Sequence, residues 1–74
     1  MPKHHTVIDG WLFTVEYPMY IQGMYKVYWD EVWIGYVYYR IDQFSAHPRI
    51  WIATTDYTQL FLTELSEFIN ALGL

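Results

Sequence analysis

Cysteine is absent from the 74-residue chain, so disulfide bridges and thiolate-bound zinc are excluded. Long apolar stretches are absent as well. The longest, residues 32–39, holds eight residues, whereas a membrane-spanning helix needs about 20. Residues 1–6 contain no apolar segment of the kind found in signal peptides. We therefore expect a cytoplasmic protein that does not contact a membrane.

Positive charge is scarce. Only four side chains are cationic, against eight carboxylates, which gives a formal net charge of −4. Because affinity for nucleic acids depends mainly on cationic contacts to phosphates, this balance disfavours a nucleic-acid partner. The carboxylates are scattered along the chain and form no acidic run, so an acidic tail is not predicted either.

Side chains that carry out chemistry are few and dispersed. His4 and His5 fall in the polar start of the chain, and His47 has no other metal-ligating residue at regular spacing beside it. Glu64 and Glu67 are expected on a solvated helix face, and the four glycines are isolated, which excludes a phosphate-binding loop. We predict that the protein is not an enzyme and has no catalytic residue, no cofactor and no bound metal.

Aromatic side chains, by contrast, are abundant. Eight Tyr, four Trp and four Phe make up 22% of the chain, and hydrophobic residues make up 54%. This composition argues against disorder, and the length allows one domain. A domain this small buries only a modest fraction of its surface, so the aromatic excess needs a core or a partner to cover it.

The alternation of apolar and polar residues predicts one domain from residue 10 to 74, preceded by a flexible lead-in at 1–9. Asp30-Glu31 separates two runs of β-branched and aromatic residues and is expected to form a hairpin turn. The predicted strands are 11–17, 25–29, 32–41 and 49–54.

The C-terminal segment has the periodicity of an amphipathic helix from Tyr57 to Leu72. Its docking residues are Phe61, Leu65, Phe68, Ile69 and Leu72. Asp56 with Gln59 resembles a capping box, Thr58 and Thr63 are alternative N-caps, and Gly73 is a suitable C-terminal stop. The fold class is therefore α+β: a four-stranded antiparallel meander, β-β-β-β-α, with one C-terminal helix packed on one face.

Pairing across the Asp30-Glu31 turn assigns the strand residues to two faces. We expect the helix to cover the more apolar set, which is Tyr25, Val27, Trp29, Val32, Ile34, Tyr36, Tyr38, Ile50 and Ile52. The opposite, outer face is then expected to hold Tyr28, Trp33, Val37, Tyr39 and Trp51, with Lys26 and Arg40 toward its rim. A register slip of one residue exchanges the two faces.

An outer face with several large aromatic rings exceeds the apolar patch that a monomer normally exposes. We therefore predict a small protein-interaction protein (an adaptor, inhibitor or accessory subunit) that forms a homodimer or binds another protein. The predicted interface residues are Lys26, Tyr28, Trp33, Val37, Tyr39 and Trp51. Three alternatives remain: coverage of the face by the chain's own lead-in or loops, single-stranded nucleic-acid binding by aromatic stacking, and carbohydrate recognition.

Overall fold

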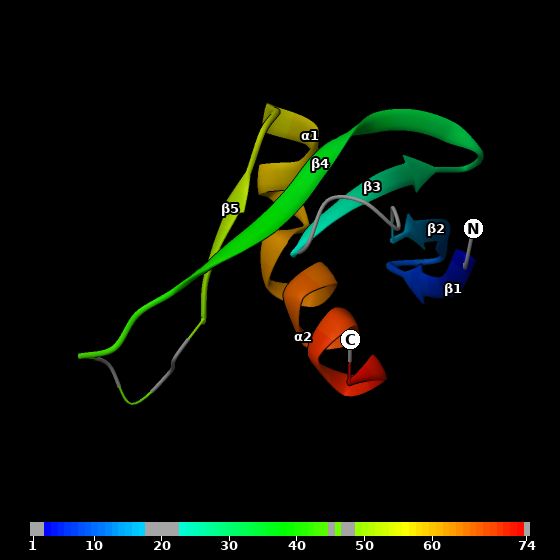
Figure 1. Cartoon of the computed structure of the whole chain (residues 1–74). Coiled ribbons are helices and arrows are strands. Elements are labelled where there is room, and N and C mark those ends of the chain that lie inside the picture. Colours follow the sequence, from blue (N-terminus) through cyan, green and yellow to red (C-terminus); the bar gives the residue numbers. More distant parts are fainter. Residues whose placement is uncertain (1–2, 18–22, 45, 47–48, 74) are drawn as a thin grey trace.

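Five antiparallel strands and two short helices make up the computed structural model (Figure 1), which describes residues 3–17, 23–44, 46 and 49–73. The strands are neighbours in chain order, β1-β2-β3-β4-β5, so the sheet is a simple meander. The elements are β1 (Lys3–Ile8), β2 (Trp11–Glu16), β3 (Met24–Trp29), β4 (Val32–Ile41), β5 (Arg49–Ala53), α1 (Asp56–Leu60) and α2 (Leu62–Leu72). The predicted α+β class and antiparallel meander are confirmed.

The prediction of four strands and a flexible lead-in is wrong for residues 3–8, because these residues form β1. They pair with β2 along their whole length, from Lys3 opposite Glu16 to Ile8 opposite Trp11. Asp9 and Gly10 form the two-residue turn with φ values of 51° and 83°. Asp-Gly is among the strongest hairpin signals, because both positions require a left-handed backbone.

The hairpin predicted at Asp30-Glu31 is confirmed. Trp29 lies opposite Val32, and the two turn residues have φ values of 50° and 66°. Two pairs farther along, the register shifts: Tyr28 pairs with Trp33, but Val27 pairs with Gly35. Ile34 is therefore an extra residue in β4, which makes this site a β-bulge. After the bulge, each residue of β4 faces the side opposite to the one that unbroken alternation predicts.

Two helices replace the single predicted one, because Phe61 interrupts the helical backbone with φ −112° and ψ 16°. Thr55, rather than Asp56, caps α1: its hydroxyl accepts a hydrogen bond from Thr58 N, and Thr58 completes the capping box. Gly73 ends α2 in the left-handed conformation, with φ 72°, as its position predicted.

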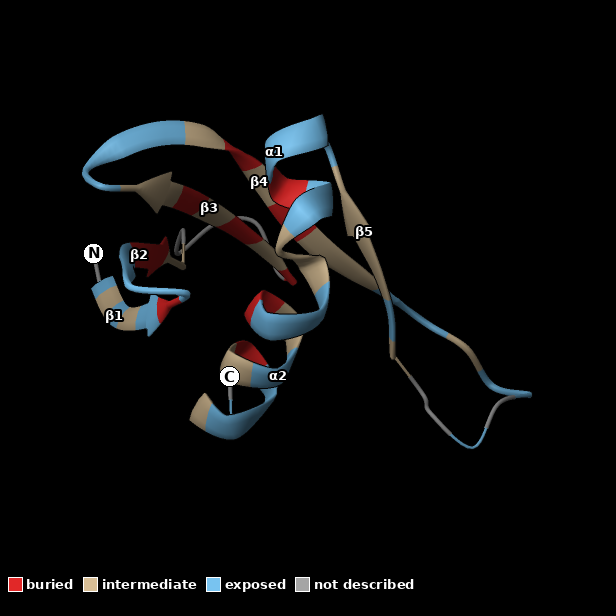
Figure 2. Ribbon diagram, turned by 180° about the vertical axis from the view of Figure 1, so that it is seen from behind, coloured by how far each residue is buried: buried red, intermediate tan, exposed pale blue. Residues whose placement is uncertain are grey.

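The core lies between the sheet and the helices (Figure 2). Its buried hydrophobic residues are Ile8, Phe13, Val15, Tyr25, Val27, Val37, Leu65 and Ile69. Of the predicted docking residues, Leu65 and Ile69 are fully buried, whereas Phe61 and Phe68 are partly buried against the core. Full burial of one such aliphatic side chain stabilises the fold by about 1.5–3 kcal/mol, so Leu65 and Ile69 are the main anchors of α2.

Candidate functional site: the open face of the sheet

The β-bulge at Ile34 decides which side chains face the helices. Its carbonyl accepts a hydrogen bond of 2.8 Å from the hydroxyl of Thr55, which precedes α1. Gly35, the next residue, has φ 142° and lies directly under this junction. A Cβ at Gly35 would stand 2.8 Å from Thr55 Cγ2 and 2.9 Å from Thr54 Oγ1. The missing side chain thus lets the β5–α1 connection pack closely on β4.

Beyond the bulge, the predicted face assignment is wrong. Val37 is fully buried, and Tyr39 and Trp51 pack against the core with ring centroids 5.2 Å apart. These three predicted interface residues therefore face the helices. Conversely, Tyr36 and Tyr38, which were expected in the core, pair with Lys26 and Met24 on the opposite side. In β5 the same correction sends Ile50 and Ile52 outward and Trp51 inward, since Trp51 pairs with Tyr39.

The other three predicted interface residues, Lys26, Tyr28 and Trp33, do lie on the side away from the helices. Trp33 pairs with Tyr28 across the strands, and its ring touches that of Tyr36 edge to face at 5.6 Å. We call this side of the sheet the open face. Its residues are Lys3, His5, Val7, Leu12, Thr14, Glu16, Met24, Lys26, Tyr28, Trp33, Tyr36, Tyr38, Arg40, Ile50 and Ile52.

The register divides the open face into two halves. The half on β3–β5 is apolar and aromatic, with Tyr28, Trp33, Tyr36 and Tyr38 on two adjacent strands. The half on β1 and β2 is largely polar. β1 extends the sheet at its edge, so residues 3–8 enlarge the open face and do not fold over it.

Cations are concentrated on the open face. Lys3, Lys26 and Arg40 lie there with two carboxylates, Glu16 and Glu31 of the β3–β4 turn, which gives this surface a net charge of +1 although the whole chain carries −4. Lys3 Nζ is 3.8 Å from Glu16 Oε2 and 5.7 Å from the centre of the Tyr28 ring. Composition alone could not reveal this segregation, because it depends on which residues share a face.

A shallow depression of about 200 Å³ lies in the polar half, lined by Lys3, His5, Thr14, Tyr28 and Glu31. Within it, His5 Nδ1 and Thr14 Oγ1 are hydrogen-bonded at 2.8 Å. The imidazole is thus tied to the wall of the depression. Among the residues that the structure describes, no group of three or more histidines and carboxylates lies close enough to hold a metal ion. His47 lies outside the described residues.

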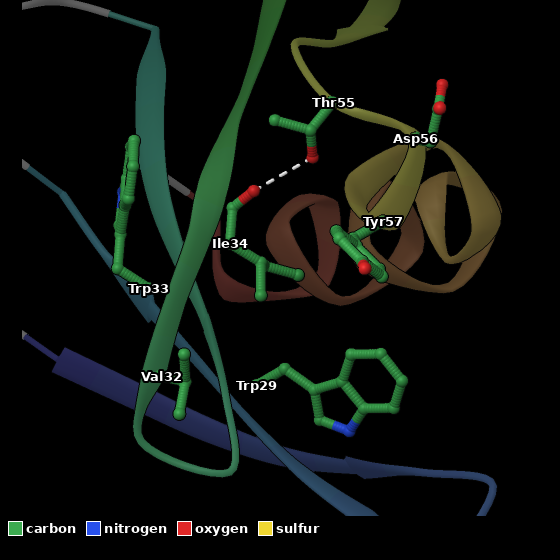
Figure 3. Close-up of a pocket in the computed structure, with 7 residues that line it drawn as sticks. All are labelled: Trp29, Val32, Trp33, Ile34, Thr55, Asp56 and Tyr57. Atoms are coloured by element: carbon green, nitrogen blue, oxygen red, sulfur yellow. Dashed lines mark hydrogen bonds between the residues drawn. The ribbon is translucent and has the colours of Figure 1, made fainter.

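A larger cavity, about 680 Å³, opens beside α1 (Figure 3). We call it the groove. Trp29 and Tyr57 lie on one side of it and Val32 and Ile34 on the other, with Thr55 and Asp56 at its rim. Trp33 also lines the groove, but its indole lies across β4 from the other side chains, toward the open face. Sequence periodicity missed the groove because it joins the β3–β4 hairpin to α1, two segments far apart in the chain.

One titratable group of the core has a shifted pKa. Burial raises the pKa of the Tyr25 hydroxyl above its usual 10.0, the neighbouring Tyr39 and Tyr17 act in the same direction, and Arg49 opposes them. Within the described part of the chain, this buried hydroxyl has no hydrogen-bond partner. Tyr25 faces the helices and is therefore a feature of the core, separate from the open face and the groove.

Neither of the two helices is long and apolar enough to cross a membrane, as far as the described residues extend. Comparison of the chain with models of protein families, with curated proteins and with solved structures gives no match. The functional conclusion therefore depends on the geometry of the surface.

Proposed function

We propose that this chain is a small non-enzymatic interaction protein that acts through the open face, where a second copy of the chain packs. The observation that carries the proposal is the aromatic strip on β3 and β4, whose most exposed side chain, Trp33, is 51% accessible. Tyr and Trp are enriched in the cores of protein interfaces, because they bury a large area with few rotatable bonds.

The size of the open face supports a protein as its occupant. Five strands spaced about 4.8 Å apart, with about 3.4 Å per residue along six residues, give a flat footprint of roughly 500 Å². Two such faces bury about 1,000 Å² in total, which is the lower size of a specific interface. Protruding side chains make the accessible area larger than this footprint, so a partner that covers the whole face reaches a sufficient size.

The distribution of side chains also fits a protein interface. Aliphatic residues of β5, Ile50 and Ile52, border the aromatic strip, which is the composition of an interface core. Lys3 lies on an edge strand and Arg40 at the far end of β4, so both are suited to a polar rim. A two-fold axis in the interface lets one apolar surface serve both copies.

Sedimentation equilibrium of matched tryptophan variants tests this proposal. Trp33 and Trp11 have nearly equal exposure, 51% and 50%, but lie on opposite faces of the sheet. Trp33→Glu is expected to yield a folded monomer, because an unpaired charge is costly in an interface. Trp11→Glu is expected to remain dimeric. A wild-type chain that is monomeric up to about 1 mM, a range that detects weak association, contradicts the second copy as the occupant.

A second candidate function, binding of single-stranded nucleic acid, is favoured by the segregation of cations. Lys26 and Arg40 flank the partly exposed rings of Tyr36 and Tyr38, and aromatic rings stack on bases while cations contact phosphates. Fluorescence anisotropy of labelled single strands tests it. Affinity that falls steeply with salt and is reduced by Trp33→Ala supports this candidate, whereas no binding at low salt excludes it.

A further inference from the structure

One edge of the sheet is β1, whose six residues all pair with β2 (Figure 1). In the described part of the chain, no strand lies on its other side. Natural proteins protect such edges with proline, bulges or charged side chains, because a regular edge is a template for another strand. β1 has no proline and no register shift, and its one formally charged residue, Lys3, stands at its start. The rest of this edge is therefore unprotected.

The hydrogen bonds of β2 show which backbone groups of β1 point to this side. Leu12 lies opposite Val7, and the Leu12 carbonyl accepts a hydrogen bond of 2.8 Å from the amide of Asp30, on the β3 side. In an antiparallel ladder, the two residues of a pair either both point toward each other or both point away, and the two kinds of pair alternate. The N–H and C=O groups of Val7, His5 and Lys3 therefore point away from β2.

The sequence of β1 complements itself when two copies run antiparallel with Thr6 at the centre. In this register Thr6 lies opposite Thr6, and threonine pairs are favourable across strands. Lys3 falls opposite Asp9 of the second copy, the first turn residue after β1, so opposite charges meet at both ends. An antiparallel register centred on His5 separates these charges, and a parallel arrangement places Lys3 beside Lys3.

The charges around Lys3 favour the approach of a second carboxylate. Lys3 Nζ is 3.8 Å from Glu16 Oε2, and Glu16 also lies opposite Lys26 on β3. One carboxylate thus stands between two ammonium groups. The side chain of Lys3 is 56% exposed, so Asp9 of a second copy can reach it and balance the excess of positive charge.

The same register also uses the outward backbone groups. His5 and Val7 lie opposite each other across the two copies, and the two pairs together form roughly four hydrogen bonds. His5 and Val7 both lie on the open face, whereas Thr6 faces the other side in each copy. The two sheets therefore continue into one another without exchanging their faces.

We propose that two copies of this chain pair edge to edge through antiparallel β1 strands, with Thr6 on the two-fold axis. The contact is isologous and closes at two copies. It goes beyond the open-face contact and is independent of it, and it brings the two open faces to the same side of one wider sheet. A few backbone hydrogen bonds give a small net gain in water, so this contact is the weaker of the two.

Single-cysteine variants test the register, because the chain contains no cysteine of its own. Across the two-fold axis the Cα atoms of the two Thr6 residues stand about 4.5 Å apart, which suits a disulfide. Two copies of His5, or of Val7, are diagonal neighbours about 7–8 Å apart, which is too far for one. Cross-linking in air is followed by non-reducing electrophoresis.

We expect Thr6→Cys to form the covalent dimer several-fold faster than His5→Cys or Val7→Cys. Random collision gives the opposite order, because Val7 is 67% exposed whereas Thr6 is half-buried. Trp33→Glu, on β4, should leave the cross-linking rate of Thr6→Cys unchanged while it removes the open-face contact. Failure of one contact is thereby distinguished from failure of the other.

Two pairs of matched substitutions in the Thr6→Cys chain test the interactions. Val7→Pro removes the outward N–H, and Val7→Ala keeps it; proline is tolerated on an edge strand whose N–H faces solvent. Asp9→Asn removes the charge opposite Lys3 but suits the turn, and Asp30→Asn is its control, since the two turn residues have φ values of 51° and 50°. Val7→Pro and Asp9→Asn should each slow cross-linking several-fold, and the controls should not.

Three results overturn the proposal. One is a Thr6→Cys chain that cross-links no faster than Val7→Cys. Another is fastest cross-linking of His5→Cys, which indicates a different register. The third is a Val7→Pro chain that cross-links as fast as its Val7→Ala control. Circular dichroism confirms that each variant is folded, and Asp9→Asn, which retains every backbone group, tests the contact independently of the proline.

Discussion

Replacement of Gly35 by alanine tests the β-bulge by adding one carbon atom at the crowded contact between β4 and the β5–α1 connection. The new Cβ would stand 2.8 Å from Thr55 Cγ2, and the residue would keep a φ of 142°. A strained backbone of this kind costs about 1–3 kcal/mol for a residue with a side chain. Displacing Thr55 also weakens the cap of α1 and its hydrogen bond to Ile34 O, each a loss of about 1 kcal/mol. The expected total is about 3–5 kcal/mol.

Urea denaturation followed by tryptophan fluorescence measures this loss of unfolding free energy. Gly10→Ala is the control, because Gly10 has φ 83° and no atom within 4 Å of a Cβ, so it reports backbone strain alone, about 1 kcal/mol. Thr55→Ser removes the crowded methyl group but keeps the capping hydroxyl. In the Gly35→Ala background it should therefore restore part of the stability. A Gly35→Ala variant as stable as Gly10→Ala would refute the close packing of the β5–α1 connection on β4.

Three further variants test local features of the fold. Leu65→Ala, at a fully buried site, should lower the free energy of unfolding by about 2–5 kcal/mol. Phe68 is only partly buried, so Phe68→Ala should lower it by less than the truncation of a fully buried Phe side chain does; urea denaturation measures both. Glu31→Gly should raise the unfolding free energy by about 1 kcal/mol, because Glu31 has φ 66° in its turn; a loss in the same assay contradicts the turn geometry. Because the pKa of Tyr25 is raised in the folded chain, its hydroxyl stays protonated at a pH where the hydroxyl of the unfolded chain already ionises. The stability that this difference provides is complete below about pH 10 and is lost as the pH rises through the folded pKa. Tyr25→Phe should flatten this alkaline loss, and tyrosinate absorbance during a pH titration should show one late-ionising hydroxyl fewer.

The hairpin, the helical C-terminus and the stop at Gly73 were predictable from sequence because each depends on local pattern. β1 was missed because Lys3, His4 and His5 make the segment look polar, although half of its residues face solvent as in any edge strand. The stronger signal was the Asp9-Gly10 dipeptide, since a hairpin turn implies a strand on both sides.

The faces of β4 were predicted correctly up to Trp33 and incorrectly from Tyr36 onward. Period-two alternation assumes an unbroken ladder, and a single extra residue reverses it. An isolated glycine inside a strand is a sign of a bulge or of a close backbone approach, and Gly35 marks both. The carbonyl of the extra residue, Ile34, is nevertheless bonded by Thr55, 21 residues later in the chain, and a contact of this range is not contained in the local pattern.

The chain has four tryptophans, and their indole N–H resonances test the central claim most directly. Trp33 lies on the open face and borders the groove, Trp29 lines the groove on the helix side of the sheet, and Trp51 packs against the core. On dilution from about 1 mM to about 20 µM, a range in which weak complexes dissociate, the account predicts that the Trp33 resonance shifts and the Trp51 resonance does not. A shifting Trp51 with a constant Trp33 would contradict the assignment of the open face as the surface that binds.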